Sequence, residues 1–112
     1  MPTLPVPRSD SLAPLGSLAV RLPDGADAFV VRLTNESFVA YLNRCPHWNV
    51  DLDMGLGDFV DPSTALITCR NHAAEFELAT GLCVQGPCAG DRLYPLEVRV
   101  EDGRAVLVLD AR

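Results

Sequence analysis

The chain has 112 residues, the length of a single domain, with 48% hydrophobic and 21% charged residues. That composition is typical of a globular protein and excludes disorder of the whole chain. The formal net charge of −6 argues against nucleic acid or an anionic membrane as the main partner. The sequence contains no targeting segment and no apolar run of the roughly 18 residues that a membrane span needs, so we expect a cytoplasmic protein.

The N-terminal segment is rich in proline. Residues 1–14 contain Pro2, Pro5, Pro7 and Pro14. Proline fixes its own φ and has no backbone N–H, so such a segment favours an extended conformation outside regular structure. The sequence therefore predicts a proline-rich arm over residues 1–14, either extended or a loosely tied terminus, followed by one domain over residues 15–112.

The rest of the chain has the pattern of an all-β protein. Short runs rich in β-branched and aromatic residues predict strands at residues 29–33, 38–42, 65–68, 76–78, 82–84, 96–100 and 105–109. Residues 34–37, 79–81 and 101–104 are turn-like and predict three hairpins. Leu96, Val98 and Val100 alternate, which indicates one shared face. No segment keeps a helical period over ten residues, so the expected architecture is a sandwich or an open barrel.

The histidines and two of the cysteines form a motif. The chain has only two histidines: His47 lies two residues after Cys45, and His72 lies three residues after Cys69. Each half is a compact loop that can point a thiolate and an imidazole at one metal centre, and each half follows a predicted strand. These four residues are therefore predicted to be metal ligands.

Two kinds of metal site take two cysteines and two histidines. In one, the thiolates hold one iron of a 2Fe–2S cluster and the imidazoles hold the other. The second is tetrahedral zinc, whose ligands in zinc fingers come as a cysteine pair followed by a histidine pair. Here each half holds one residue of each type, which favours the cluster. A zinc-stabilised β module for protein interaction stays open as the alternative.

At this point the sequence resembles the Rieske and Rieske-type ferredoxin family. Cys45-Pro46-His47 and Cys69-Arg70-Asn71-His72 are similar to the family's two-loop signature. Residues 76–81 resemble the hairpin after the second loop, and residues 86–90 resemble the proline-containing loop over the cluster. The resemblance extends over residues 17–110. It implies a fold of small antiparallel sheets with a two-loop cluster-binding subdomain, which holds one [2Fe–2S] cluster per chain.

The residues beside the ligands differ from those of the high-potential members. In the Rieske proteins of respiratory cytochrome complexes, a cysteine in each loop forms a disulfide, and a serine hydroxyl donates to a cluster sulfide. The corresponding positions here are Trp48, Asn49 and Val50 in the first loop, and Ala73 and Ala74 in the second. Hydrogen bonds to the sulfurs raise the potential. We therefore expect a potential near the low end of the Rieske range, about −150 mV rather than about +300 mV.

The resemblance implies an electron carrier that serves protein redox partners, a reductase and a terminal acceptor such as an oxygenase. Substrate turnover by the chain alone is not expected, because it has no histidine left for a mononuclear iron site and no Gly-rich dinucleotide fingerprint. An alternative that also uses the cluster is that the chain is the small Rieske-like subunit of a nitrite-reductase-type enzyme.

Other polar residues have simpler interpretations. Cys83 and Cys88 lie outside the motif, and we expect two reduced, partly buried thiols. Four aspartates lie between the two ligand pairs: Asp51, Asp53, Asp58 and Asp61. They predict either a solvated loop or an acidic face that steers a basic redox partner.

Overall fold

The computed structural model describes residues 3–33, 37–44, 59–61, 63–69, 74–86 and 90–109. Within these residues the chain forms ten strands and one short 3-10 helix. They are β1 (Thr3–Pro5), η1 (Ser9–Ser11), β2 (Ser17–Arg21), β3 (Asp27–Arg32), β4 (Phe38–Leu42), β5 (Val60–Asp61), β6 (Leu66–Thr68), β7 (Glu75–Glu77), β8 (Cys83–Gln85), β9 (Pro95–Glu101) and β10 (Arg104–Val108).

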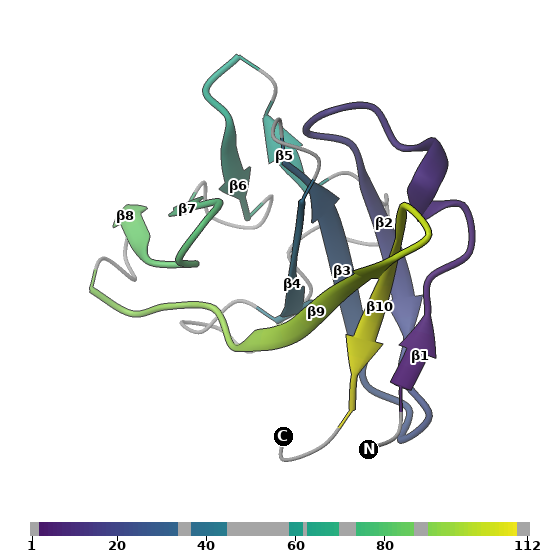
Figure 1. The fold of residues 1–112 in the computed structure, drawn as a ribbon. Coiled ribbons are helices and arrows are strands. Elements are labelled where there is room, and N and C mark those ends of the chain that lie inside the picture. Colours follow the sequence, from purple (N-terminus) through teal and green to yellow (C-terminus); the bar gives the residue numbers. More distant parts are fainter. Residues whose placement is uncertain are drawn as a thin grey trace.

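The strands form two antiparallel sheets that lie beside each other (Figure 1). The larger sheet has the order β1-β10-β9-β4-β3-β2, and the smaller has the order β5-β6-β7-β8. The edge strands β1 and β2 of the larger sheet line one groove of about 320 Å³, so that sheet curls into an open barrel. The all-β expectation is confirmed, and the small sheet supplies the second, shorter-stranded subdomain.

All three expected hairpins are present. Strands β3 and β4 pair from Ala28↔Leu42 to Arg32↔Phe38, and β7 pairs with β8 through a bulge. Strands β9 and β10 are joined through Asp102 and Gly103, which have φ of 54° and 77°. Positive φ at both central residues is what a type I′ turn requires, and that turn matches the twist of the strands.

Part of the N-terminal arm is an edge strand of the larger sheet. Residues 3–5 are not loosely attached, because they form β1 and pair with β10 from Thr3↔Val108 to Pro5↔Val106. Val6 is 1% exposed, and its N–H donates to the carbonyl of Ala105 at 2.9 Å. Proline is tolerated here because β1 is an edge strand, where a missing N–H faces away from the sheet.

Two hydrophobic cores explain the long apolar run in β3. Successive side chains of a strand point to opposite faces. Ala28 and Val30 enter the core inside the open barrel, while Phe29 and Val31 enter the core between the barrel and the small sheet. We call these the barrel core and the junction core. Strand β3 is therefore buried on both faces, which is why its pattern is continuous rather than alternating.

Strand β9 is less buried than its alternation suggests. Leu96 is 9% exposed, but Val100 on the same face is 48% exposed. Strand β9 pairs with β4 only at Ala40↔Leu96 and Tyr41↔Pro95, whereas it pairs with β10 along five positions. Beyond Leu96 it runs away from β4 and across the barrel (Figure 1). The shared face is thus buried at one end only.

Candidate metal centre

Of the four predicted ligands, Cys69 alone lies within the described residues. Cys45, His47 and His72 lie outside them. Accordingly, the described residues contain no group of three or more His, Cys, Asp or Glu side chains placed to hold a metal ion. The structure describes the segments that lead into the two ligand motifs.

Cys69 stands at the base of the second motif. It directly follows β6, and its side chain is almost completely buried, with 1% of the residue exposed. Its backbone N–H donates to the carbonyl of Ala74 at 2.8 Å, so one hydrogen bond closes the segment 70–73 at its base. The preceding residue, Thr68, donates its N–H to the carbonyl of Phe59 at 3.0 Å. Backbone hydrogen bonds therefore fix Cys69 and Ala74, the two described residues that flank the segment 70–73.

The first motif starts from the other sheet. Strand β4 continues into Asn43, which is 8% exposed and donates its N–H to the carbonyl of Asp27 at 2.9 Å. Arg44 donates its N–H to the carbonyl of Leu42 at 2.9 Å. Backbone hydrogen bonds thus fix the chain up to the residue before Cys45.

The junction core joins the elements that carry the two motifs. Phe29 stacks on Phe59, with ring centroids 4.2 Å apart and an angle of 4° between the ring planes. The ring centroid of Phe29 also lies 5.9 Å from that of Tyr41. The core consists of Phe29, Val31, Tyr41, Phe59, Val60, Ile67, Cys69, Ala74, Phe76, Cys83 and Leu93. A buried cysteine at the mouth of a closed loop, bordered by apolar side chains that exclude water, fits a thiolate ligand of a buried cluster.

The base of the proline-containing segment packs against the base of the second motif. Gly86 has φ of +107°, and a Cβ placed on it would lie 2.8 Å from Cα of Ala74. Cys83 donates its N–H to the carbonyl of Asp91 at 2.8 Å and accepts from the N–H of Gly90 at 3.3 Å. Only a glycine permits this approach, so Gly86 packs directly against Ala74, the described residue that follows the second motif.

Cys83 is more buried than we expected. It is 3% exposed, and its Sγ donates to the carbonyl of Gln85 at 3.3 Å. Cys88 lies outside the described residues.

Asp61, one of the four aspartates between the motifs, has a local structural role. Its Oδ1 accepts hydrogen bonds from Oγ of Ser63 at 2.7 Å and from the N–H of Ser63 at 2.9 Å. These hydrogen bonds lower the pKa of the Asp61 carboxyl. Asp61 therefore caps the turn between β5 and β6, as an aspartate in an Asx turn does. Asp51, Asp53 and Asp58 lie outside the described residues.

Two features near the motifs were not anticipated from the sequence. Tyr41 donates its hydroxyl to the carbonyl of Leu78 at 2.7 Å, across the gap between the sheets. The contact between Gly86 and Ala74 is the other feature. Both join residues far apart in the chain, and local patterns carry no signal for such contacts.

Within the described part of the chain, no helix has the length and apolarity needed to cross a membrane.

Comparison with known proteins identifies the family. The family model for the Rieske [2Fe–2S] domain matches residues 3–105. No curated protein matches the sequence.

Solved structures of two similar chains superpose on nearly the whole chain. The ferredoxin of carbazole 1,9a-dioxygenase from Nocardioides aromaticivorans IC177 has 28% identity and a TM-score of 0.72, covering 94% of this chain and 97% of that one. A complex of reduced oxygenase and oxidised ferredoxin of carbazole 1,9a-dioxygenase contains a chain with 24% identity and a TM-score of 0.77, covering 98% of this chain and 95% of that one.

A longer protein matches over one part only. The terminal oxygenase of carbazole 1,9a-dioxygenase from Novosphingobium sp. KA1 has 24% identity and a TM-score of 0.80, but the match covers 30% of that chain and 98% of this one. The family match extends over nearly all of the sequence and agrees with the fold. The chain therefore belongs to the Rieske [2Fe–2S] domain family and is an electron-transfer protein with a [2Fe–2S] cluster.

Proposed function

We propose that this protein is a cytoplasmic Rieske-type ferredoxin that carries electrons from a reductase to a terminal oxygenase or a similar acceptor. The observation that carries the proposal is the match over 97% of the Nocardioides ferredoxin, at 28% identity. The terminal oxygenase matches over only 30% of its length.

The proposed ligands are Cys45 and Cys69 on one iron and His47 and His72 on the other. The cluster, when bound, supplies a one-electron centre. The chain supplies the platform. The hydrogen bond from Cys69 to Ala74 holds the base of the second motif, and the junction core keeps water from the thiolate side. Because Ala73 and Ala74 offer no side-chain hydroxyl to the cluster sulfurs, we expect a midpoint of about −150 mV in a dye-mediated titration.

The acidic charge of the chain supports a basic docking partner. With a net charge of −6, the chain attracts a positively charged surface at long range, and salt screens that attraction. We expect the rate of reduction by its reductase to fall as ionic strength rises. A rate that is independent of salt would contradict the steering hypothesis.

The proposal is tested by spectroscopy and then by electron transfer. Freshly purified protein should be coloured, contain iron and acid-labile sulfide in equal amounts, and bleach with dithionite. It should then pass electrons from NADH and a flavin-dependent ferredoxin reductase to cytochrome c, used as an artificial acceptor. Colourless protein with one zinc and no sulfide would support the interaction module instead.

A second candidate is the small subunit of a nitrite-reductase-type enzyme. A Mycobacterium tuberculosis protein assigned as the small subunit of an NADH-dependent nitrite reductase covers 99% of this chain and 97% of its own, with 23% identity and a TM-score of 0.74. The two candidates differ in how they bind their partner. A subunit co-purifies in a stable complex, whereas a ferredoxin is isolated alone and binds its partners transiently.

A further inference from the structure

The two proposed ligand pairs start from different sheets. Cys45 follows the end of β4 in the larger sheet, and Cys69 follows β6 in the small sheet. If both pairs bind one cluster, as the proposed function requires, their separation depends on how the small sheet sits on the larger one. Contacts between the sheets therefore bear on the cluster even where they lie away from the ligands.

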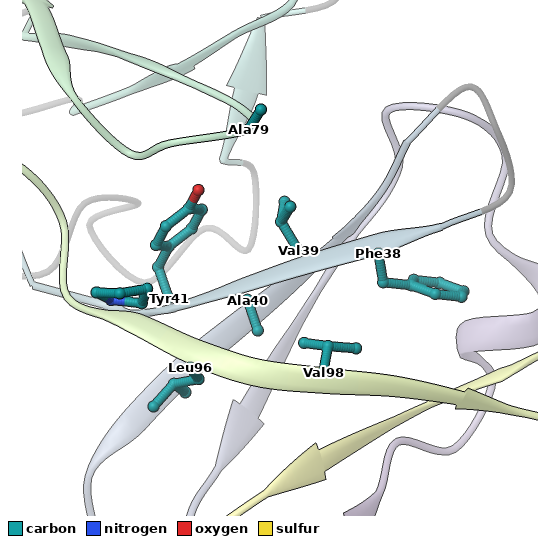
Figure 2. A pocket seen from close by; sticks show the side chains of 8 residues that line it. Phe38, Val39, Ala40, Tyr41, Ala79, Leu96 and Val98 are labelled. Atoms are coloured by element: carbon teal, nitrogen blue, oxygen red, sulfur yellow. The ribbon is translucent and has the colours of Figure 1, made fainter.

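Tyr41 connects the two sheets directly. It belongs to β4, is 2% exposed, and donates its hydroxyl to the carbonyl of Leu78 in the turn between β7 and β8 at 2.7 Å. Figure 2 shows its side chain pointing from β4 toward the segment that carries Ala79. The ring also lies against Gly81, where a Cβ would come within 2.7 Å of the ring carbon Cε1. Hydrogen bond and ring contact together define one position for this turn.

A second connection between the sheets runs through Phe59. Phe29 of β3 stacks on Phe59, and the carbonyl of Phe59 accepts the N–H of Thr68, directly before Cys69. The segment 70–73 lies in the chain between β6 and β7. Strand β6, before this segment, is thus linked to the larger sheet through Phe59. Strand β7, after it, belongs to the β7–β8 hairpin, which is linked to the larger sheet through Tyr41.

The packing beside Tyr41 leaves room for movement. A groove of about 140 Å³ opens there, lined by apolar residues of β4 and β9 and by Ala79 of the turn (Figure 2). This groove gives the turn space to shift into, so we expect it to move there once the Tyr41 contacts are weakened.

We propose that Tyr41 is a positioning residue for the cluster: it fixes the small sheet on the larger one and thereby sets the separation of the two ligand pairs. The hydroxyl sets the height of the β7–β8 turn above β4, and Gly81 lets the ring approach. Without the hydroxyl, the small sheet pivots about the Phe29–Phe59 stack, and the ligand geometry becomes less well defined.

The test compares Tyr41→Phe, which keeps the ring and removes the hydroxyl, with Tyr94→Phe at an exposed tyrosine. Gly81→Ala presses on the ring from the turn, and Gly103→Ala is its control, because Gly103 has a similar φ of +77° and no described atom within 4 Å of its Cβ position. The readouts are cluster loss to an iron chelator, followed by visible absorption, and the EPR spectrum of the reduced protein. All are recorded well below the unfolding temperature, with far-UV circular dichroism on the same samples.

We expect Tyr41→Phe and Gly81→Ala to lose the cluster about threefold to tenfold faster than their controls, with broadened EPR lines, while the backbone stays folded. If folded Tyr41→Phe loses the cluster at the wild-type rate and has wild-type EPR line widths, the inference about Tyr41 is overturned and the proposed function still stands. Faster loss with unchanged EPR lines and an equal fall in global stability would also overturn it, since that describes a purely structural residue. Wild-type protein without iron and sulfide would overturn the proposed function as well.

Discussion

The two sheets differ in what holds them together. In the larger sheet, β2, β3, β4, β9 and β10 have five to seven residues each. The pairs β2–β3, β3–β4 and β9–β10 run along five positions each, whereas β4 and β9 pair at two. In the small sheet, the strands have two or three residues each. Such short strands are marginal by themselves. The small sheet must therefore draw stability from contacts outside its own hydrogen bonds.

The cores show the same difference. The barrel core is built only from the larger sheet and its loops, with members such as Val30, Ala40 and Leu107. The junction core takes residues from both sheets. The larger sheet is thus a scaffold with a core of its own, whereas the small sheet depends on that scaffold. If its loops bind the cluster, cluster binding also adds to its folding free energy.

The largest effect is expected from Cys69→Ser. A serine hydroxyl is a poor substitute for a thiolate, so the variant should be isolated without the cluster and without colour. The small sheet should then lose protection while the scaffold keeps it. Hydrogen–deuterium exchange should show faster exchange in β6 and β7 and nearly unchanged exchange in β3 and β4.

Cys83→Ser is the matched control for that variant. Cys83 is also a buried cysteine of the junction core, but it lies outside the ligand motif. The Cys83→Ser variant should keep iron and sulfide at the wild-type level. A colourless Cys83→Ser, or a coloured Cys69→Ser with a normal spectrum, would argue against the proposed ligand set.

Gly86→Ala should have the next largest effect. A methyl group there meets Cα of Ala74 at 2.8 Å, and φ of +107° is strained for alanine. We expect a loss of about 1–3 kcal/mol from crowding, added to about 1–2 kcal/mol from the backbone. Gly90→Ala has a φ of +97° and no described atom within 4 Å of the new Cβ, so it should show only the backbone part. Denaturant unfolding followed by the cluster absorption separates the two, and equal losses would rule out the contact with Ala74.

How well the sequence predicted the fold differs between the two regions. The three hairpins were predictable because each is a local pattern of β-prone runs around turn residues, as at Asp102-Gly103. Strands β2 and β5 were missed. Strand β2 mixes Ser17 and Arg21 with apolar residues, and β5 has only two residues. The prolines of residues 1–14 suggested a loose arm, but β1 is held by its pairing with β10, which no local signal reveals.

The sequence also predicted some parts of the candidate site and missed others. The spacing of Cys45, His47, Cys69 and His72 is a local signal, so a ligand set could be proposed from sequence. Tyr41 and Gly86 act through partners 37 and 12 residues away, Leu78 and Ala74. Such contacts depend on how two sheets pack, and packing is settled by the tertiary fold rather than by neighbouring residues.

Ser9→Ala should destabilise the scaffold without affecting the site. Ser9 is fully buried, and its Oγ donates to the carbonyl of Val6 at 2.7 Å and accepts from the N–H of Ala105 at 2.8 Å. Losing both hydrogen bonds leaves a buried N–H without a partner and should cost about 1–3 kcal/mol. Thermal unfolding should show this loss, and Ser11→Ala on the same short helix should not. The midpoint potential should stay at the wild-type value, and a shifted potential would contradict the separation of scaffold and site.

The smallest effect concerns alkaline pH and the connection between the sheets. Burial raises the pKa of Tyr41 to about 12, with a smaller opposing effect from Arg92 and a smaller supporting one from Glu77. An unfolded chain would ionise this hydroxyl near its usual value of 10.0, so the stability due to neutral Tyr41 is complete below that pH and is lost as pH rises toward 12. The basic residues are all arginine, so no lysine titrates in this window.

Unfolding midpoints at about pH 9 and about pH 11 should therefore fall more in the wild type than in Tyr41→Phe. Tyr94→Phe should follow the wild type. Because ionised Tyr41 can no longer donate to Leu78, the hairpin β7–β8 should gain exchange at alkaline pH before β3 and β4 do. Simultaneous loss of protection in both sheets would mean that the small sheet does not depend on this tyrosine for its attachment to the scaffold.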